Sequence, residues 1–205
     1  AAQCGKFLDS IEADRLYALY HLAAYWGLRR SELCGLGWAD VDLKSRRVHV
    51  RQAQADSDLD STKSEGSDRI VVIDPQTARV LEAWRECQIF ERLERGDGWQ
   101  DSGRVFTRED GQPLRPGHVG EHFAVLARQA GLSPIRFHDL RHGAATMLIA
   151  AGQPVKVVSE ILGHATSSFT MDVYAVVAEE LSEAAAVAIA AFVPRRASNV
   201  PAEGQ

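Results

Sequence analysis

Side chains that can act together on a phosphate ester gather between residues 138 and 174 of this sequence. His138 and Arg141 lie three residues apart. His164 follows a Leu-Gly pair, and Tyr174 comes ten residues after that histidine. A tyrosine hydroxyl, with a pKa of about 10, is a weak nucleophile at neutral pH unless its proton is removed and the charge building on the substrate is neutralised. Imidazole and guanidinium groups can do both, so the set predicts nucleophilic attack by Tyr174, although each residue alone more often has a structural role.

Helical periodicity is expected to position these groups. After His138, apolar residues recur at steps of three and four, so His138 and Arg141 share one edge of a helix. A Gly-Gln-Pro turn follows, and a second short apolar helix stops at Gly163. His164 therefore lies just past a helix end. A third short helix, capped by a serine, is expected to carry Tyr174.

A further arginine precedes this region. The first long helix is expected to begin at Asp9 or Ser10 and to end at Gly27. Arg29 follows, with Glu32 three residues later. Such a pair can orient itself and leave guanidinium donors for a phosphate, although a solvated surface ion pair is the alternative interpretation.

A lysine lies between two predicted strands. Residues 47–51 alternate around two valines, and residues 68–73 end in a β-branched run, so both are expected to be strands. Lys63 lies in the loop between them. A lysine at a hairpin tip can reach a bound substrate and donate a proton to a departing group. The alternative is a loop lysine without a function.

Two other helices are expected as scaffold, over residues 76–95 and from Pro116 to Gly131, with a short strand at 105–107 between them. His118 and His122 lie four apart on the second helix. They are interpreted as surface or DNA-backbone contacts, and a metal site is the less favoured alternative.

Composition indicates one globular domain. The 205 residues are 45% hydrophobic and 25% charged, enough to bury one core. No apolar run approaches membrane-spanning length and no signal-peptide pattern opens the sequence, so a cytoplasmic protein without membrane partners is expected. Cys4, Cys34 and Cys87 are widely spaced and form no C-x-x-C pair, which predicts reduced thiols.

The net charge of −5 argues against a generic nucleic-acid binder, because phosphate contacts usually require a basic surface. Its distribution weakens that argument. Residues 29–51 hold six basic against three acidic side chains, whereas residues 82–110 hold five basic against eight acidic. The positive charge therefore accompanies the candidate motifs.

The motifs H-D-L-R-H, L-G-H and T-M-D-V-Y resemble the C-terminal signature of the tyrosine recombinase (phage integrase) family. The segment G-L-R-R-S-E-L is similar to the family's first-arginine box. The lysine of S-T-K-S-E, with S-x-R downstream, resembles its β-hairpin lysine. The likeness runs from about Phe7 to Val193. By this resemblance the catalytic residues are Arg29, Lys63, His138, Arg141, His164 and Tyr174.

The resemblance implies transesterification of DNA, and the residue types suit that chemistry. Guanidiniums from Arg29 and Arg141 can hold one phosphate by charge-assisted hydrogen bonds and neutralise its transition state without a metal. Glu32 supports the first of these arginines. His138 would assist proton removal from Tyr174.

Two further roles follow from the resemblance. His164 would donate a hydrogen bond to the phosphate, and Lys63 would protonate the 5′ leaving oxygen. The phosphotyrosyl ester keeps the bond energy for rejoining, so neither metal, ATP nor another cofactor is expected. The expected DNA-binding residues are Arg30, Lys44, Arg46, Arg69 and Arg136.

The fold implied is mixed α/β, mainly α-helical with a small antiparallel β-sheet, as in the family's catalytic domain. Residues 1–193 are expected to form that domain, as a fragment lacking the N-terminal core-binding domain, with a disordered tail at 194–205. The implied function is site-specific recombination for a phage or mobile element. The implied partners are a double-stranded DNA target site, the core-binding domain and further copies of the chain, a tetramer in synapsis.

Three alternatives stay open. A metal-dependent hydrolase could use His138, His142 and His164, since the first two echo H-E-x-x-H, but this leaves Arg29 and Tyr174 unexplained. A DNA-binding regulator that keeps the fold without the chemistry is argued against by the complete set. A type IB topoisomerase would share the chemistry and relax supercoils instead of exchanging strands.

Overall fold

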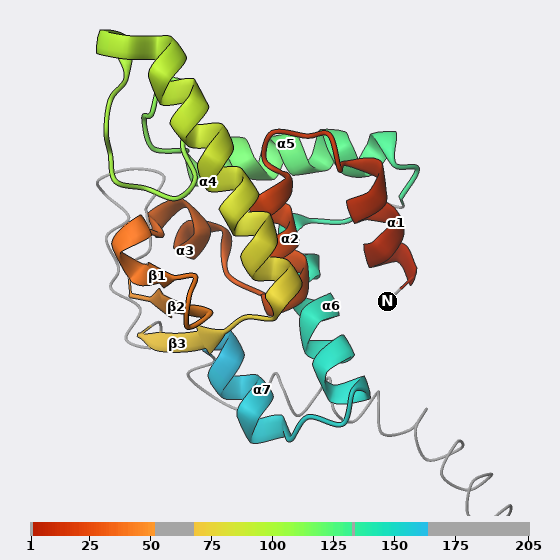
Figure 1. Cartoon of the computed structure of the whole chain (residues 1–205). Helices are drawn as coiled ribbons and strands as arrows, with labels where there is room; N and C mark the ends of the chain where they lie inside the picture. The colour runs from red at the N-terminus through yellow and green to blue at the C-terminus, as the bar shows by residue number, and fades with distance from the viewer. Residues whose placement is uncertain (1, 52–67, 133, 164–205) are drawn as a thin grey trace, which may run out of the picture.

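A computed structural model describes residues 2–51, 68–132 and 134–163 of the chain. Over these residues the molecule is mainly helical, with a three-stranded antiparallel sheet at one side (Figure 1), as the sequence predicts. The helices are α1 (Ala2–Ser10), α2 (Tyr17–Trp26), α3 (Arg30–Gly35), α4 (Pro75–Arg95), α5 (Pro116–Gln129), α6 (Phe137–Ala150) and α7 (Val155–Leu162). The strands are β1 (Val41–Asp42), β2 (Arg47–Val50) and β3 (Arg69–Val72), and two 3-10 turns are η1 (Trp38–Asp40) and η2 (Gly96–Gly98).

Helix α2 is the centre of the core, because nearly every residue of its sequence YALYHLAAYW is apolar or aromatic. Leu19, Tyr20 and Leu22 are completely buried. Helices α1, α3, α4 and α6 pack around it, and the long helix α4 crosses in front of it in Figure 1. The ends of α2 and of its neighbours are therefore fixed by a common core.

The sheet has the strand order β1-β2-β3, each strand antiparallel to the next. Val48 pairs with Val71, and both side chains are buried. Ile70 and Val72, which point to the other face of β3, are each 56% exposed. This alternation is what a strand shows when one face lies on the core. Helix α7 packs against β3, at the lower edge of the sheet in Figure 1.

Most element boundaries follow local sequence signals. The strands predicted at 47–51 and 68–73 correspond to β2 and β3, and the helix predicted at 76–95 is α4. The carboxylate of Asp74 caps α4 by accepting from two backbone N–H groups of its first turn, and a proline occupies the first helical position. Helices α5, α6 and α7 also begin and end close to their predicted limits.

The predicted start of the first long helix is wrong. Helix α1 ends at Ser10, whose hydroxyl donates to the Phe7 carbonyl at 2.7 Å, and α2 begins only at Tyr17. Between them the carboxylate of Asp14 accepts from a backbone N–H two residues later at 2.8 Å. Asp9 and Ser10 therefore lie at the end of one helix instead of the start of the next.

The predicted strand at 105–107 is also absent from the described residues. Isolated bridges pair Arg104 with Gly37 and Thr107 with Pro113, and no continuous ladder forms among the described residues. Its backbone is bonded by several separate groups instead: Gln88 and Trp84 of α4 both donate to the carbonyl of Val105, the Val105 N–H donates to the Leu36 carbonyl, and Arg15 donates to the Thr107 carbonyl. The apolar run is buried in the core without a neighbouring strand.

His122, interpreted from the sequence as a surface or DNA-backbone contact, is only partly exposed and has partners within the protein. Its Nδ1 lies 3.0 Å from the Tyr20 hydroxyl, and its Nε2 lies 3.3 Å from a carboxylate oxygen of Asp14. His118, one turn earlier, is exposed, and its ring lies parallel to that of His122 with centroids 6.3 Å apart. The surface interpretation therefore fits His118 better than His122.

The end of α2 is the point where three helices meet. Gly27 closes α2 in the left-handed conformation, with φ of 63°. A Cβ at this position would overlap Leu162 of α7 and lie 3.3 Å from Ala144 and 3.4 Å from Arg141 of α6. Only glycine fits, because both the backbone conformation and the space exclude a side chain.

We expect Gly27→Ala to lower the free energy of unfolding by about 2–4 kcal/mol, since a strained left-handed residue and an overpacked contact each cost about 1–3 kcal/mol. Urea unfolding measures this change. Gly143→Ala is the matched control, because a Cβ at Gly143 in the middle of α6 meets no atom within 4 Å. That variant should be as stable as wild type or slightly more so. Equal stability of the two variants would contradict the account of Gly27.

Within residues 2–51, 68–132 and 134–163, none of the helices combines the length and the hydrophobicity that a membrane crossing requires.

Candidate active site

Arg29 is held at the N-terminus of α3 by the glutamate three residues later. Its backbone N–H and its Nη1 donate to the two carboxylate oxygens of Glu32, at 2.8 and 2.7 Å. Its Nη2 donates to the carbonyl of Gly163, the residue that ends α7, at 2.7 Å. The predicted ion pair is thus present, and it also connects α3 to the end of α7.

Glu32 has a second basic partner, Arg69 at the start of β3. The side chain of Arg69 is only 8% exposed. Its Nη1 and Nη2 donate to the two oxygens of Glu32 at 2.9 and 3.0 Å, and its Nε donates to the carbonyl of Ile161 at 2.6 Å. The structure thus places Arg69 inside the protein, against the expectation of a surface DNA contact.

The inward direction of Arg69 has a sequence signal. Side chains alternate along a strand, so Arg69 shares a face with Val71 and Ile73. Both of these are buried, whereas the intervening Ile70 and Val72 are exposed. The β-branched pattern therefore indicates that an arginine at this position points to the core side, where it needs an internal acidic partner.

Arg141 is the most buried basic group of the site. It lies on α6 and is 3% exposed. Its Nη1 donates to the carbonyl of Gly27 at 2.7 Å. Its Nη2 is buried and has no hydrogen-bond partner among the described residues. A buried guanidinium nitrogen without an acceptor is energetically costly unless an anion binds there.

The electrostatics of this cluster favour an anionic ligand. Burial, and then repulsion from Arg29, lowers the pKa of Arg141 to about 9, and attraction to Glu32 opposes the shift. Arg141 therefore still carries its charge at neutral pH. Burial alone would raise the pKa of Glu32, but hydrogen bonds and charges from Arg69 and Arg29 outweigh it and hold that pKa below its ordinary value. Three guanidiniums thus face one ionised carboxylate, an excess of positive charge.

His138 lies one turn before Arg141 on α6, on the exposed side. Its imidazole is perpendicular to that of His142, with ring centroids 5.0 Å apart. Partial burial lowers the pKa of His138, and the nearby charges of His142 and Arg141 lower it further. The ring is therefore neutral at pH 7, which is the form that can accept a proton.

The remaining predicted DNA contacts differ in exposure. Lys44 and Arg46 are exposed in the turn between β1 and β2, and Arg136 precedes α6 with a side chain that is 81% exposed. Arg30 is half-buried, and its guanidinium lies against Gly120 of α5, leaving no space for a Cβ there. Three of these four residues are thus available to a ligand in solvent.

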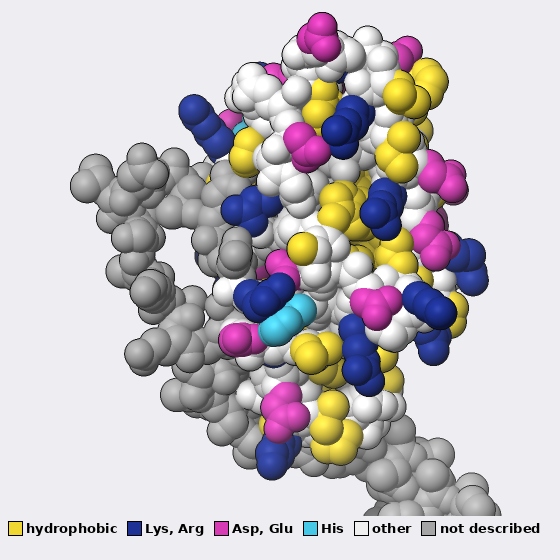
Figure 2. Space-filling view, turned by 60° about the vertical axis from the view of Figure 1, so that its left-hand side comes forward, with side chains coloured by type: hydrophobic (Ala, Val, Ile, Leu, Met, Phe, Trp, Pro, Cys, Tyr) yellow, Lys and Arg dark blue, Asp and Glu magenta, His cyan; other side chains and the backbone are white. Residues whose placement is uncertain are grey.

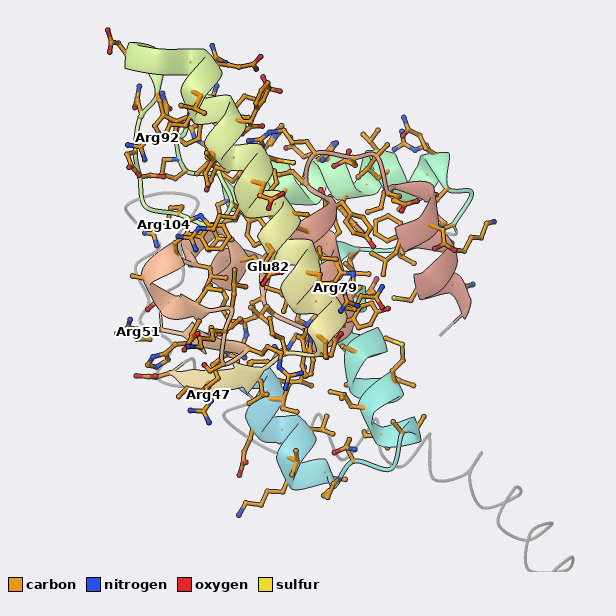
Figure 3. All side chains as sticks on the ribbon, viewed as in Figure 1. Arg47, Arg51, Arg79, Glu82, Arg92 and Arg104 are labelled. Atoms are coloured by element: carbon orange, nitrogen blue, oxygen red, sulfur yellow. The ribbon has the colours of Figure 1, made fainter. Side chains whose placement is uncertain are left out.

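The surface charge on this side is mixed. Figure 2 shows basic side chains interspersed with acidic ones, without one continuous basic patch. Figure 3 shows Arg47 and Arg51 projecting outward from the sheet, and Arg51 pairs with Asp40. The charge on this face is therefore mixed, whereas Arg69 and Arg141 lie inside the protein near Glu32.

Three of the six residues expected to be catalytic lie outside the described residues, namely Lys63, His164 and Tyr174. Lys63 belongs to the segment that joins β2 to β3, and His164 directly follows Gly163 in the chain. The structure thus brings together Arg29 and Arg141, with His138 beside the latter, and the roles of all six stay predictions.

The phage integrase family model matches residues 2–180, so the chain belongs to the phage integrase family of tyrosine recombinases. A tyrosine recombinase XerC-like protein of Caldanaerobacter subterraneus subsp. tengcongensis is 31% identical over 185 residues, which are 82% of this chain and 47% of that protein. The ICEBs1 integrase of Bacillus subtilis is 30% identical, with the same two coverages. The chain thus spans about half the length of the curated relatives that it matches.

Solved structures show the same fold. The XerA recombinase crystal structure is 23% identical, with a TM-score of 0.73, over 96% of this chain and 65% of that one. The Tn1549 transposon integrase, solved in complex with transposon right end DNA, is also 23% identical, with a TM-score of 0.72, over 85% of this chain and 60% of that one. The fold is therefore that of tyrosine recombinases.

Proposed function

We propose that this chain is the catalytic part of a site-specific DNA recombinase that cuts and rejoins strands through a covalent phosphotyrosine. One observation carries the proposal: Arg141 is charged and buried, and one of its nitrogens has no partner among the described residues. Arg29 lies close enough for the two charges to interact. Two planar guanidiniums in one site fit the nonbridging oxygens of a phosphate.

The proposed reaction is a transesterification. The Tyr174 hydroxyl oxygen attacks the phosphorus, and its proton passes to a base, for which we propose His138. The bond between phosphorus and the 5′ oxygen breaks, and Lys63 supplies the proton that this oxygen takes up. The product is a 3′-phosphotyrosyl ester with a free 5′ hydroxyl, and the reverse attack by another 5′ hydroxyl rejoins the strands.

The arginines act on the charge that develops during this step. The pentacoordinate phosphate is more negative than the starting diester, and preformed donors at its oxygens stabilise it without rearrangement during the reaction. Arg29 is fixed by Glu32 and by Gly163, and Arg141 is fixed by Gly27. We propose that His164, next to Gly163 in the chain, adds a hydrogen bond to the same phosphate.

The same proposal includes the partners. Double-stranded DNA would lie against the arginine cluster, with Lys44, Arg46 and Arg136 as peripheral phosphate contacts. The chain has a net charge of −5, so a separate core-binding domain would supply much of the phosphate grip. Strand exchange would take place in a tetramer of the recombinase. Relatives named as recombinases and integrases favour this function over that of a type IB topoisomerase.

A covalent adduct tests the function directly. Duplexes of randomised sequence with a nick let the short cut piece diffuse away, so that rejoining fails and the protein stays attached to DNA. Denaturing electrophoresis after incubation should show this adduct, and sequencing the attached DNA identifies the preferred site. The complete absence of adduct over all positions of the nick would overturn the proposed function.

Chelation distinguishes this mechanism from a metal-dependent hydrolase that uses His138 and His142. We expect EDTA to leave the rate of adduct formation unchanged within about twofold, because the guanidiniums supply the charge that a metal would otherwise provide. The measurement is adduct yield against time after dialysis into chelator. Loss of activity that added zinc or magnesium restores would favour the hydrolase.

A further inference from the structure

Arg69 joins three elements that are distant in the sequence. Its guanidinium contacts Glu32 of α3 through two nitrogens and the Ile161 carbonyl of α7 through the third. It begins β3, the strand that follows the segment containing Lys63. One side chain therefore ties the sheet to both helices that approach Arg29.

Arg29 and Arg69 both donate hydrogen bonds to Glu32 and to carbonyl groups at the end of α7. Oε1 of Glu32 accepts from both arginines, at 2.7 and 2.9 Å. Ile161 and Gly163 are two residues apart at the end of α7, and the carbonyl of the first accepts from Arg69 and that of the second from Arg29. The contacts thus form a closed network in which neither arginine can shift without disturbing the partners of the other.

The network also explains how a carboxylate stays ionised at 1% exposure. Burial raises the pKa of Glu32, and the hydrogen bond and charge of Arg69 come first among the contributions that lower it again. Without Arg69, Glu32 would keep one basic partner instead of two. A less firmly ionised Glu32 would orient Arg29 less well.

We propose that Arg69 is a positioning residue, which fixes Glu32 and the end of α7 so that Arg29 points its remaining donors at the scissile phosphate. The role rests on the function proposed above. It differs from a DNA contact, because a side chain that is 8% exposed and bonded through all three nitrogens to the protein is poorly placed to meet a phosphate from solvent.

The first test is Arg69→Gln, with DNA affinity and cleavage measured separately. We expect the rate of adduct formation on saturating nicked DNA to fall about ten- to a hundredfold, the scale of a small misplacement of a catalytic group. The dissociation constant for DNA should change by less than about twofold, since no phosphate contact is lost. A weaker affinity with a normal rate on bound DNA would overturn the proposal and make Arg69 a DNA contact.

Arg69→Lys separates charge from geometry. An ammonium keeps the charge but cannot bond two carboxylate oxygens and a carbonyl in one plane. This variant should therefore recover less than about a tenth of the wild-type rate. Lys44→Gln is the matched comparison for a solvent-exposed phosphate contact. It should weaken the affinity for DNA without lowering the rate of adduct formation on saturating DNA. Near wild-type rates with Arg69→Lys would show that charge alone suffices.

The double variant with Glu32→Gln tests whether Arg69 acts through Glu32. The two rate losses should not multiply, because each change breaks the same network. Both rates should fall at low pH, because His138 then takes up a proton, but the rate of Arg69→Gln should begin to fall at a higher pH than that of wild type, because Glu32 is less firmly ionised in the variant. The proposal would be overturned if the rate losses of the two single variants multiply in the double variant and if Arg69→Gln and wild type have the same pH profile.

Thermal unfolding keeps this test independent of activity. If Arg69 acts through Glu32, the double variant should unfold at about the temperature of the less stable single variant. If wild type forms no adduct, the proposed function fails, and this cycle still decides whether the two residues are coupled. If the shifts in unfolding temperature of the two single variants add in the double variant, the two residues are not coupled, whatever the activity.

Discussion

Tyr174→Phe is expected to abolish the covalent protein–DNA adduct. The change removes only the hydroxyl oxygen that would attack the phosphorus, and loss of the nucleophile in covalent catalysis lowers rates by roughly 10⁴-fold or more. The affinity for DNA should stay within about twofold of wild type, because the phosphate grip is assigned to the arginines and not to the phenol. The measurements are adduct yield on the nicked duplex and binding to the intact duplex.

Tyr25→Phe is the matched control for this prediction. Tyr25 lies near the end of α2, is 42% exposed and stacks on His21, with ring centroids 4.2 Å apart. Removing its hydroxyl should leave both adduct yield and affinity unchanged. An adduct that persists in Tyr174→Phe would move the nucleophile to another residue, and mapping the attached peptide would identify it.

The sequence predicts those parts of the fold whose signals are local. Asp74 before a proline marks the start of α4, and Gly27 and Gly163 mark the ends of α2 and α7, because caps and left-handed glycines act through hydrogen bonds a few residues away. The pair of Arg29 and Glu32 is predicted for the same reason, since three residues in a helix bring side chains together.

Contacts between distant segments are not predicted in this way. Periodicity can indicate that Arg69 points inward, but its partner Glu32 lies 37 positions away and becomes visible only when β3 packs beside α3. His122 is similar, because its bond to Tyr20 spans 102 positions. The segment 105–107 has the composition of a strand, yet side chains of α4 bond the carbonyl of Val105 where a neighbouring strand would otherwise do so. In each case tertiary packing decides the role of the residue.

The candidate site likewise has a part that the sequence predicts and a part that only the structure shows. The order and spacing of six residues predict a recombinase, and the family match agrees. The spacing does not show that one nitrogen of Arg141 is buried without an acceptor, which is the physical feature that calls for an anion. Unsatisfied buried groups are a property of packing, so they appear only in the structure.

Arg141→Lys is expected to slow adduct formation by about a hundred- to a thousandfold, equivalent to about 3–4 kcal/mol of transition-state stabilisation. Nη1 of the guanidinium donates to the Gly27 carbonyl, and Nη2, which has no partner among the described residues, can donate to a phosphate. An ammonium group at the end of a flexible side chain cannot donate to the Gly27 carbonyl and to the phosphate with the same fixed geometry. Single-turnover cleavage on saturating nicked DNA gives the rate, and a rate within about threefold of wild type would remove Arg141 from the phosphate clamp.

Arg141→Met distinguishes a functional arginine from a structural one. Methionine fills similar space without a charge, and replacing a buried, incompletely paired ion by an apolar side chain is often neutral or stabilising. We therefore expect this variant to lose adduct formation while its free energy of unfolding, measured in urea without DNA, stays equal to that of wild type or rises. Arg47→Met is the control, because Arg47 is exposed on β2, and neither quantity should change much there. If Arg141→Met unfolds far more easily than wild type, the guanidinium serves the fold through its bond to Gly27, and the argument from an unsatisfied charge to a phosphate site fails.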